Sequence, residues 1–305
     1  MPDNNSNLEN IDLPIAKSPQ RVSGMRVLKE QWKLPGKPTD LSSDAADSWR
    51  QTSFNFAEEI RLIENGLNLE AKFSASAYTL SARNMDMAGF ATLWGRSFLT
   101  CSDITTLIRR GGYQSAMPLI RQAVELIGAQ EGLTNEIDMW RSWTHEAFNQ
   151  ESDSRAIEQK VGHYFSGESI AADHDLRTIY KAASDFGRPN FGPSALFVAN
   201  GANRIRYPLV FGDQAFHIGW AELIFGWLML LNRKQLHLSM HIPKFFPINE
   251  ELKQLVIEHI QIIEEYLSND QRCKIEEYKD NSGRPRLLMI NFRRQLSDQR
   301  SRLLF

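Results

Sequence analysis

The sequence predicts an all-α protein, a helical bundle with a small C-terminal β-hairpin. Apolar residues recur at steps of three and four over several long segments, which places them on one face of a helix. The most apolar segment, 216–231, is continuous enough to form a central core helix, and its Trp220, Phe225 and Trp227 should be buried against the helices of 86–128. Alternation typical of strands occurs in 272–293, on both sides of an Asn-Ser-Gly turn.

The N-terminal residues 1–43 carry several prolines and no sustained apolar period, so we expect a mobile tail or a strap laid on the surface. Asp44 is the expected N-cap of the first helix. The apolar face of that helix holds Trp49, Phe56, Ile60 and Ile63. The stretch 67–84 is less regular and is not assigned to a helix.

The strongest helix signal runs from Met87 to Ile108. The pair Gly111-Gly112 is expected to end this helix, because glycine readily takes the left-handed conformation that closes helices. Ser115 is the expected N-cap of the next helix, with Pro118 in its first turn, where a missing N–H breaks no hydrogen bond. The two helices should form an antiparallel hairpin.

Further helices are expected at 133–150, 152–166, 173–186, 214–237 and 248–268. The connection 187–213 is far longer than the roughly 2–8 residues usual in bundles, and long loops often carry function. The chain then divides into a mobile N-terminal tail (1–43), a helical bundle domain (44–268) and a β-hairpin with a basic C-terminal tail (269–305).

Composition and motifs narrow the function classes. A net charge of −2 gives no reason to expect a strongly basic nucleic-acid surface. The run 216–231 is short of the roughly 20 apolar residues of a membrane span. There is no secretory signal, and the two cysteines lie far apart, so we expect a reduced, cytoplasmic location. The GxGxxG, GxxxxGK[ST] and GxSxG fingerprints are missing, and no cofactor is expected.

Three other patterns each have two interpretations. His237 and His241 are one turn apart and could share a metal, but there is no HExxH and we favour solvent-facing histidines without metal. Aromatic residues at 140 and 143, beside His145 and Glu146, could stack on a ligand, although core packing is the more frequent use. The excess of Lys and Arg after Gln271 could contact phosphates, but a solvated appendage is favoured.

Two charged residues on an otherwise apolar helix mark the candidate site. Arg121 and Glu125 are four residues apart and can pair on one face. If they are buried, they need partners from another segment, because an unpaired buried charge would not persist. Such a cluster can be a ligand site or a polar network that only fixes helix register.

Two motifs carry a resemblance to a known group. "IRRGGYQSAMPLIRQAVE" and "IYKAASDFGRPNFGPS" resemble the R-G…A…L-x-R-x-x-x-E hairpin and the Tyr-x-x-x-Ser…His-Pro motif of a broad group of uncharacterised bacterial all-helical proteins. The resemblance covers about residues 85–240 and implies a helical bundle in which both motifs meet at one polar site. It assigns to that site Arg121, Glu125, Tyr180 and Ser184, with Arg188 in place of the group's His.

The expected function is therefore that of a binding or interaction protein, with a polar Arg/Glu site that holds an anionic or polar group. The resembled group is loosely similar to the HEPN nucleases, so the alternative is a HEPN-like ribonuclease or phosphodiesterase with an unconventional site. HEPN catalysis uses an Arg followed by four to six residues and a His, a spacing that none of the seven histidines here shows. The partner stays open between a protein, a polar or anionic ligand, a second copy of the chain in a homodimer and, with less support, a nucleic acid. No membrane partner is expected.

Overall fold

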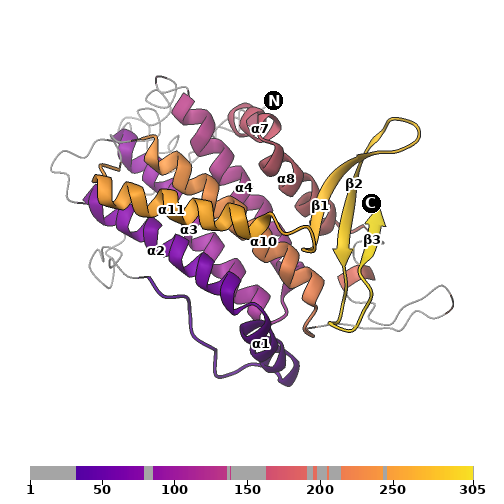
Figure 1. Ribbon diagram of the computed structural model, residues 1–305. Coiled ribbons are helices and arrows are strands. Elements are labelled where there is room, and N and C mark those ends of the chain that lie inside the picture. The colour runs from indigo at the N-terminus through magenta and orange to yellow at the C-terminus, as the bar shows by residue number, and fades with distance from the viewer. Residues whose placement is uncertain are drawn as a thin grey trace, which may run out of the picture.

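The computed structural model describes residues 32–78, 85–135, 138, 163–190, 195–197, 205, 214–242 and 246–304. Helices dominate, and a three-stranded antiparallel sheet stands at one side of the bundle, next to α8 and the beginning of α10 (Figure 1). The fold class predicted from the sequence is confirmed. In the part of the chain that the structure describes, no helix is both long and apolar enough to cross a membrane.

The first predicted helix is two helices, α1 (Ser43–Asn55) and α2 (Ala57–Tyr78). Ser42 caps α1, since its hydroxyl accepts from the amide of Ala45 at 3.3 Å, so the predicted cap at Asp44 is wrong. The helix is interrupted at Phe56, whose buried ring has its centroid 5.4 Å from that of Phe225.

The stretch 67–78 is helical, contrary to the prediction of an irregular segment. Helix α2 contacts both α10 and α11, so its buried surface is wider than a single stripe. When a helix is buried on several sides, its apolar residues no longer recur only at steps of three and four, so the sequence does not show the helical period clearly.

Helices α3 (Met85–Arg109) and α4 (Tyr113–Asn135) form the predicted hairpin. Gly111 has φ +76°, and a Cβ there would lie 2.1 Å from the carbonyl oxygen of Gln214, so the turn requires glycine. The predicted cap at Ser115 is wrong, because Gly112 already accepts the first helical bond from Ala116. Pro118 therefore lies in the second turn of α4 rather than in the first.

Helices α7 (His163–Ala172) and α8 (His174–Gly187) pack along α4. Asp173 caps α8 by accepting from the amide of Leu176 at 2.9 Å. Lys234 joins three elements, since its ammonium donates to Glu131 of α4 and to Asp173, each at 2.8 Å. The predicted helix 173–186 agrees with α8, whereas most of the predicted helices 133–150 and 152–166 lies outside the described residues.

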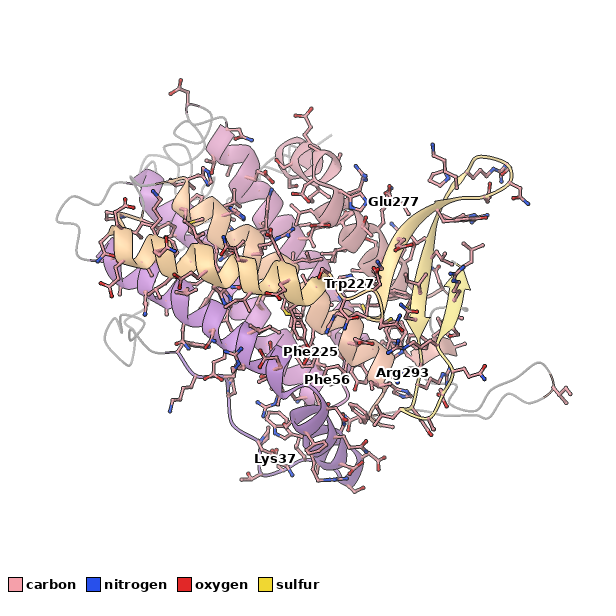
Figure 2. All side chains as sticks on the ribbon, in the orientation of Figure 1. Lys37, Phe56, Phe225, Trp227, Glu277 and Arg293 are labelled. Atoms are coloured by element: carbon pink, nitrogen blue, oxygen red, sulfur yellow. The ribbon has the colours of Figure 1, made fainter. Side chains whose placement is uncertain are left out.

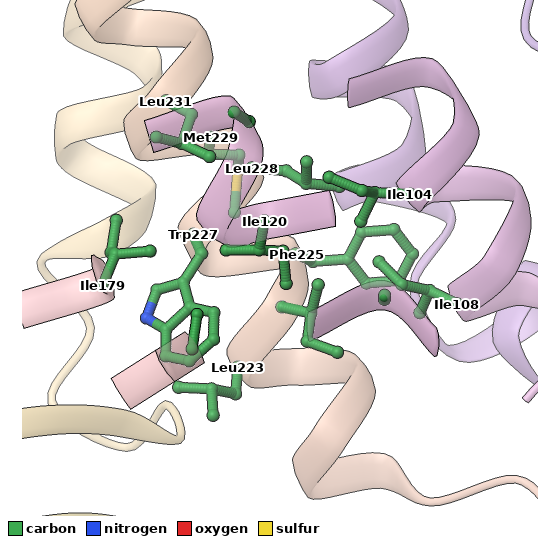
Figure 3. Close-up of a cluster of buried hydrophobic side chains, with 14 of the residues drawn as sticks. Ile104, Ile108, Ile120, Ile179, Leu223, Phe225, Trp227, Leu228, Met229 and Leu231 are labelled. Atoms are coloured by element: carbon green, nitrogen blue, oxygen red, sulfur yellow. The ribbon is translucent and has the colours of Figure 1, made fainter. Parts of the chain in front are cut away.

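Helix α10 (Ile218–Met240) is the buried central helix that the sequence predicts. Phe225 points toward Ile104 and Ile108 of α3, while Trp227 lies on the opposite side of α10 (Figure 3). The expectation that Trp220, Phe225 and Trp227 are buried is confirmed, since each is at most 4% exposed.

The aromatic neighbours of Trp220 differ from those expected. Its ring packs against Phe186 of α8, Phe197 and Phe292 of the sheet, at centroid distances of 5.0, 4.4 and 5.2 Å. We expected the α3–α4 hairpin to cover it, and to cover Trp227, which instead faces α8, the end of α11 and β1. Trp220 instead joins α8 and the sheet to the helical core.

Helix α11 (Glu250–Leu267) leads into a sheet of β1 (Lys274–Lys279), β2 (Pro285–Phe292) and β3 (Ser301–Leu304), in the order β1-β2-β3. The predicted hairpin is present, with Gly283 at φ +76° in its turn. The residues assigned to a basic tail contribute the third strand, which pairs with β2 through an irregularity between Met289 and Phe292.

The basic C-terminal segment is not simply a solvated appendage. Arg272 is buried and forms an ion pair of 3.1 Å with Glu59 of α2, their side chains being 8% and 6% exposed. On the edge of the sheet, Glu277 of β1 accepts from Arg177 and Lys181 of α8, and these hydrogen bonds lower its pKa to about 2 (Figure 2). Ion pairs therefore tie the start of the sheet to two helices.

Backbone hydrogen bonds also join the segment after β2 to the beginning of α10. His217 provides no side-chain cap, but the amides of Ile218 and Gly219 donate to the carbonyl oxygens of Arg294 and Arg293, at 3.1 and 2.9 Å. A Cβ at Gly219 would lie 2.6 Å from the Arg293 oxygen. A glycine is therefore needed for this close approach.

Residues 32–42, which the sequence places in the N-terminal tail, form a strap on the bundle. The Trp32 ring packs edge-on against Phe98 of α3, with centroids 4.9 Å apart, and its amide donates to the side chain of Asn68. Arg109 donates to the carbonyl oxygen of Pro35 at 3.3 Å. The remainder of the predicted tail, 1–31, lies outside the described residues.

We expect Gly219→Ala to lower the free energy of unfolding by about 1–3 kcal/mol, because the added methyl group would clash with the capping carbonyl of Arg293. Gly226→Ala in the same helix is the matched control. Its Cβ would meet nothing closer than 3.9 Å, so it should raise stability by about 0.5–1 kcal/mol. Urea unfolding followed by circular dichroism measures both, and equal effects would contradict the cap.

Replacing Trp220 by Ala should cost about 3–5 kcal/mol of unfolding free energy, because it empties a site lined by three aromatic rings. Phe54→Ala serves as the control, since Phe54 is 84% exposed and should change stability by no more than about 0.5 kcal/mol. A loss below about 1 kcal/mol for Trp220→Ala in the same unfolding experiment would show that this packing contributes little.

Candidate functional site

Helix α4 carries Arg121 and Glu125 on its outer side, away from the apolar residues that face the core. Arg121 Nε donates to Glu125 Oε1 at 3.1 Å. The two side chains are 41% and 43% exposed, so the pair is accessible to solvent. The other sides of α4 are largely buried, so packing against the bundle fixes the helix that carries the pair.

Helix α8 brings Tyr180 to the same place. Gly128 of α4 allows α7 to approach closely, since a Cβ there would lie 2.8 Å from Ile170. At the other end, a Cβ on Gly187 would lie 4.0 Å from Pro118, so α7 and α8 run antiparallel to α4. Midway along, Arg121 Nη2 donates to the Tyr180 hydroxyl at 3.1 Å, and its Cζ lies 5.2 Å from the ring centroid.

The other two residues of the sequence-based site do not join this contact. Ser184, one turn after Tyr180, is buried, and its hydroxyl has no hydrogen-bond partner among the described residues. Arg188 is exposed at the C-cap of α8, and in the described part of the chain its side chain forms no hydrogen bond or ion pair. The structure brings Arg121, Glu125 and Tyr180 together, whereas Ser184 is buried one turn farther along α8 and Arg188 lies at the helix end.

The arrangement leaves hydrogen-bond donors available. A guanidinium has five N–H groups, and the described contacts of Arg121 use its Nε and one Nη2 donor. Burial lowers the pKa of Arg121, but attraction to Tyr180 and Glu125 outweighs this and raises it above its ordinary value. The permanently charged guanidinium and the phenol can hold a carboxylate or a phosphate.

A second polar cluster lies inside the bundle, around the carboxyl group of Glu70. Its two oxygens accept from Asn232 Nδ2 at 2.6 Å and from Gln235 Nε2 at 3.2 Å. Gln235 also contacts Ser97, whose hydroxyl accepts from Gln130 Nε2 at 3.2 Å. This network joins α2, α3, α4 and α10.

Burial raises the pKa of Glu70 to about 8, although the hydrogen bonds from Asn232 and Gln235 lower it in part. The carboxyl group is therefore largely protonated at neutral pH. Asn232 Oδ1 has no partner in the described part of the structure, and it packs directly on Gly66. Rotation of the Asn232 amide would let its Oδ1 accept a hydrogen bond from the protonated carboxyl group of Glu70.

Sequence reasoning missed this cluster for a specific reason. Its α2 member lies in the stretch that was considered irregular, so no buried face was assigned to Glu70. The polar residues Asn232 and Gln235, in a helix that is otherwise strongly apolar, were the available signal. Because buried polar groups need partners, they indicate a polar residue on a facing helix.

Other candidates give no further site. Within the described ranges, no group of three or more His, Cys, Asp or Glu side chains is placed to hold a metal. His241 Nδ1 lies 2.7 Å from the carbonyl oxygen of His237, at the exposed end of α10. The aromatic cluster at 140–146 lies outside the described residues.

Comparisons with family models, curated proteins and solved structures find no match to this chain. The candidate site therefore depends on its geometry and chemistry alone.

Glu70→Gln should change how stability depends on pH. The pKa of Glu70 is about 8 in the folded protein and 4.5 ordinarily, so the folded protein favours the protonated carboxyl group. The contribution of Glu70 to the free energy of unfolding is therefore greatest below pH 4.5. That stability is lost as pH rises toward 8, at up to about 1.4 kcal/mol per pH unit. The Gln variant should lack this slope and be the more stable protein at pH 8.

Urea unfolding at several pH values between 4.5 and 8.5 measures this effect. Glu265→Gln, at an exposed position of α11, is the matched control and should have the same pH profile as the unmodified protein. Parallel profiles for Glu70→Gln and the unmodified protein would mean that Glu70 ionises normally.

Proposed function

We propose that this protein is a helical binding protein that holds an anionic or polar group of its ligand at Arg121 and Tyr180, with Glu125 orienting the guanidinium. The observation that carries the proposal is that Arg121 links α4 to α8 and remains 41% exposed. Exposed ion pairs contribute little stability, so a purely structural role would gain little from this pair.

The preferred ligand group is a carboxylate or phosphate, because a guanidinium presents parallel N–H donors to two oxygens of such a group. The Tyr180 hydroxyl accepts from Arg121 and keeps its own hydrogen free to donate. Arg188 would add a second positive charge near Arg121. It follows Gly187, and Gly187 lies beside Pro118, which is one turn before Arg121 in α4.

A cytoplasmic location belongs to the same proposal. Cys101 and Cys273 are both free and buried, on α3 and directly before β1. Free cysteines suit a reducing compartment, where thiols are kept reduced.

A HEPN-like ribonuclease or phosphodiesterase is the competing proposal. In the described part of the chain, no histidine forms a hydrogen bond or ion pair with Arg121, Glu125 or Tyr180. Among the described residues, the carboxylate that contacts Arg121 is that of Glu125, and the ion pair with Arg121 engages it. A site with donors but no free base favours binding over catalysis.

Inorganic phosphate should stabilise the protein against heat in a saturable way. At ten times its dissociation constant the gain is about 1.4 kcal/mol, which raises Tm by about 2–4 °C in a chain of this size. Tyr180→Phe removes only the hydroxyl and should weaken the effect, and Arg121→Gln should abolish it. Lys181→Ala, at a neighbouring position paired with Glu277, is the control and should respond normally.

Differential scanning calorimetry with a phosphate series, against chloride at equal ionic strength, makes this measurement. A phosphate response that is the same in Arg121→Gln would place the anion elsewhere. Incubation with total RNA decides the alternative: reproducible cleavage that is abolished by Arg121→Ala would support the nuclease instead.

A further inference from the structure

A pocket of about 310 Å³ lies between α8, α10, the end of α11 and β1, and it is separate from the Arg121 site. Its wall includes Ile179, Leu223, Trp227 and Leu267, which makes it mainly apolar. Trp227 lies where the helices meet the start of the sheet (Figure 2). Pockets of this size and composition are typical of sites for small organic molecules.

Two polar groups in the wall have no protein partner in the described part of the chain. Thr178 is only 5% exposed, and its buried hydroxyl forms no hydrogen bond. The indole N–H of Trp227, whose ring also lines the pocket, forms no hydrogen bond with the described residues but is not fully buried. Figure 3 shows this N–H on the edge of the ring that points away from α10. A buried hydroxyl without a partner is rare in native proteins, so Thr178 marks a place for a polar group of a ligand, and the Trp227 N–H is a second donor in the same wall.

Among the described residues, the carboxylate, guanidinium and ammonium groups that line the pocket are each paired with a charge of the opposite sign. Asp175 pairs with Arg233 at 2.7 Å, Arg272 with Glu59 at 3.1 Å, and Lys274 with Glu276 at 3.1 Å. A charged ligand would be desolvated here without a free counter-charge, which is unfavourable. The pocket therefore suits an uncharged molecule.

We propose that this pocket is a binding site for a small, uncharged, largely apolar molecule that carries a hydrogen-bond acceptor such as a carbonyl group. The apolar body lies against Leu223 and Ile179. The acceptor takes the indole N–H of Trp227, and the Thr178 hydroxyl is the second polar contact. The site is independent of the anion site proposed for Arg121.

Acetophenone and ethylbenzene provide a matched pair of probes, since they have nearly the same shape and differ by one carbonyl group. With 5-fluorotryptophan incorporated, the ¹⁹F resonance of Trp227 is assigned from its absence in Trp227→Phe. Acetophenone should shift this resonance saturably, with a dissociation constant about fivefold to tenfold lower than that of ethylbenzene. Benzoate, which is charged, should not shift it.

Substitutions at two positions locate the probe and identify its contacts. Gly226 lines the pocket, so Gly226→Leu should fill it and abolish the shift, whereas Gly226→Ala adds one methyl group with room to spare and should retain binding. Thr178→Val should weaken acetophenone binding about threefold to tenfold and leave ethylbenzene unchanged. Circular dichroism confirms that each variant is folded.

The proposal is overturned if acetophenone produces no saturable shift of Trp227 up to millimolar concentration in the unmodified protein. It is also overturned if folded Gly226→Leu binds as well as Gly226→Ala, because the probe would then lie outside the pocket. Equal affinity for both probes would remove the acceptor from the proposed ligand and leave only an apolar cavity.

Discussion

The burial of α10 is the constraint on which the rest of the structure depends. A helix that is apolar over most of its surface must be covered on most sides, and α10 contacts α2, α3, α4, α8, α11 and the sheet. Phe225 and Trp227 point to opposite sides of it, so separate sets of helices are needed to bury them (Figure 3). The bundle is arranged around this helix, and the positions of α4 and α8 follow from it.

This extensive burial also means that several polar groups of α10 cannot be hydrated. At its beginning, two free amides are satisfied by the carbonyl groups of Arg293 and Arg294, which draws the end of β2 onto the helix. Farther along, Asn232 and Gln235 require the carboxyl group of Glu70. The C-terminal sheet and the polar network are therefore two responses to the same requirement that buried polar groups be paired.

The two polar clusters differ in what their surroundings permit. Glu70 is removed from water, so its proton is retained at neutral pH and it behaves as an uncharged hydrogen-bonding group. Arg121 keeps its charge and a large exposed area, so its remaining donors are available to molecules in solution. Burial thus makes one cluster a part of the core, and exposure makes the other suitable for binding.

The sequence by itself determined the fold class, the α3–α4 hairpin with its glycine turn, the buried helix α10 and the β-hairpin. Each of these depends on local signals, namely apolar period, turn glycines and alternation. The pairing of Arg121 with Glu125 was also accessible, since a spacing of four places both on one face of a helix. The expectation that Tyr180 lies near this pair came from the resemblance of two motifs to a known group, and not from the spacing of residues.

Only the tertiary structure decided the features that depend on contacts between distant segments. Contacts between distant residues form the third strand, the buried pair of Arg272 and Glu59, and the network around Glu70. They also cover the helix that includes 67–78. The pocket beside Trp227 needs four elements to enclose it. A periodic pattern shows which face of a helix is buried, but not which neighbour covers it, because that depends on how all the faces pack together.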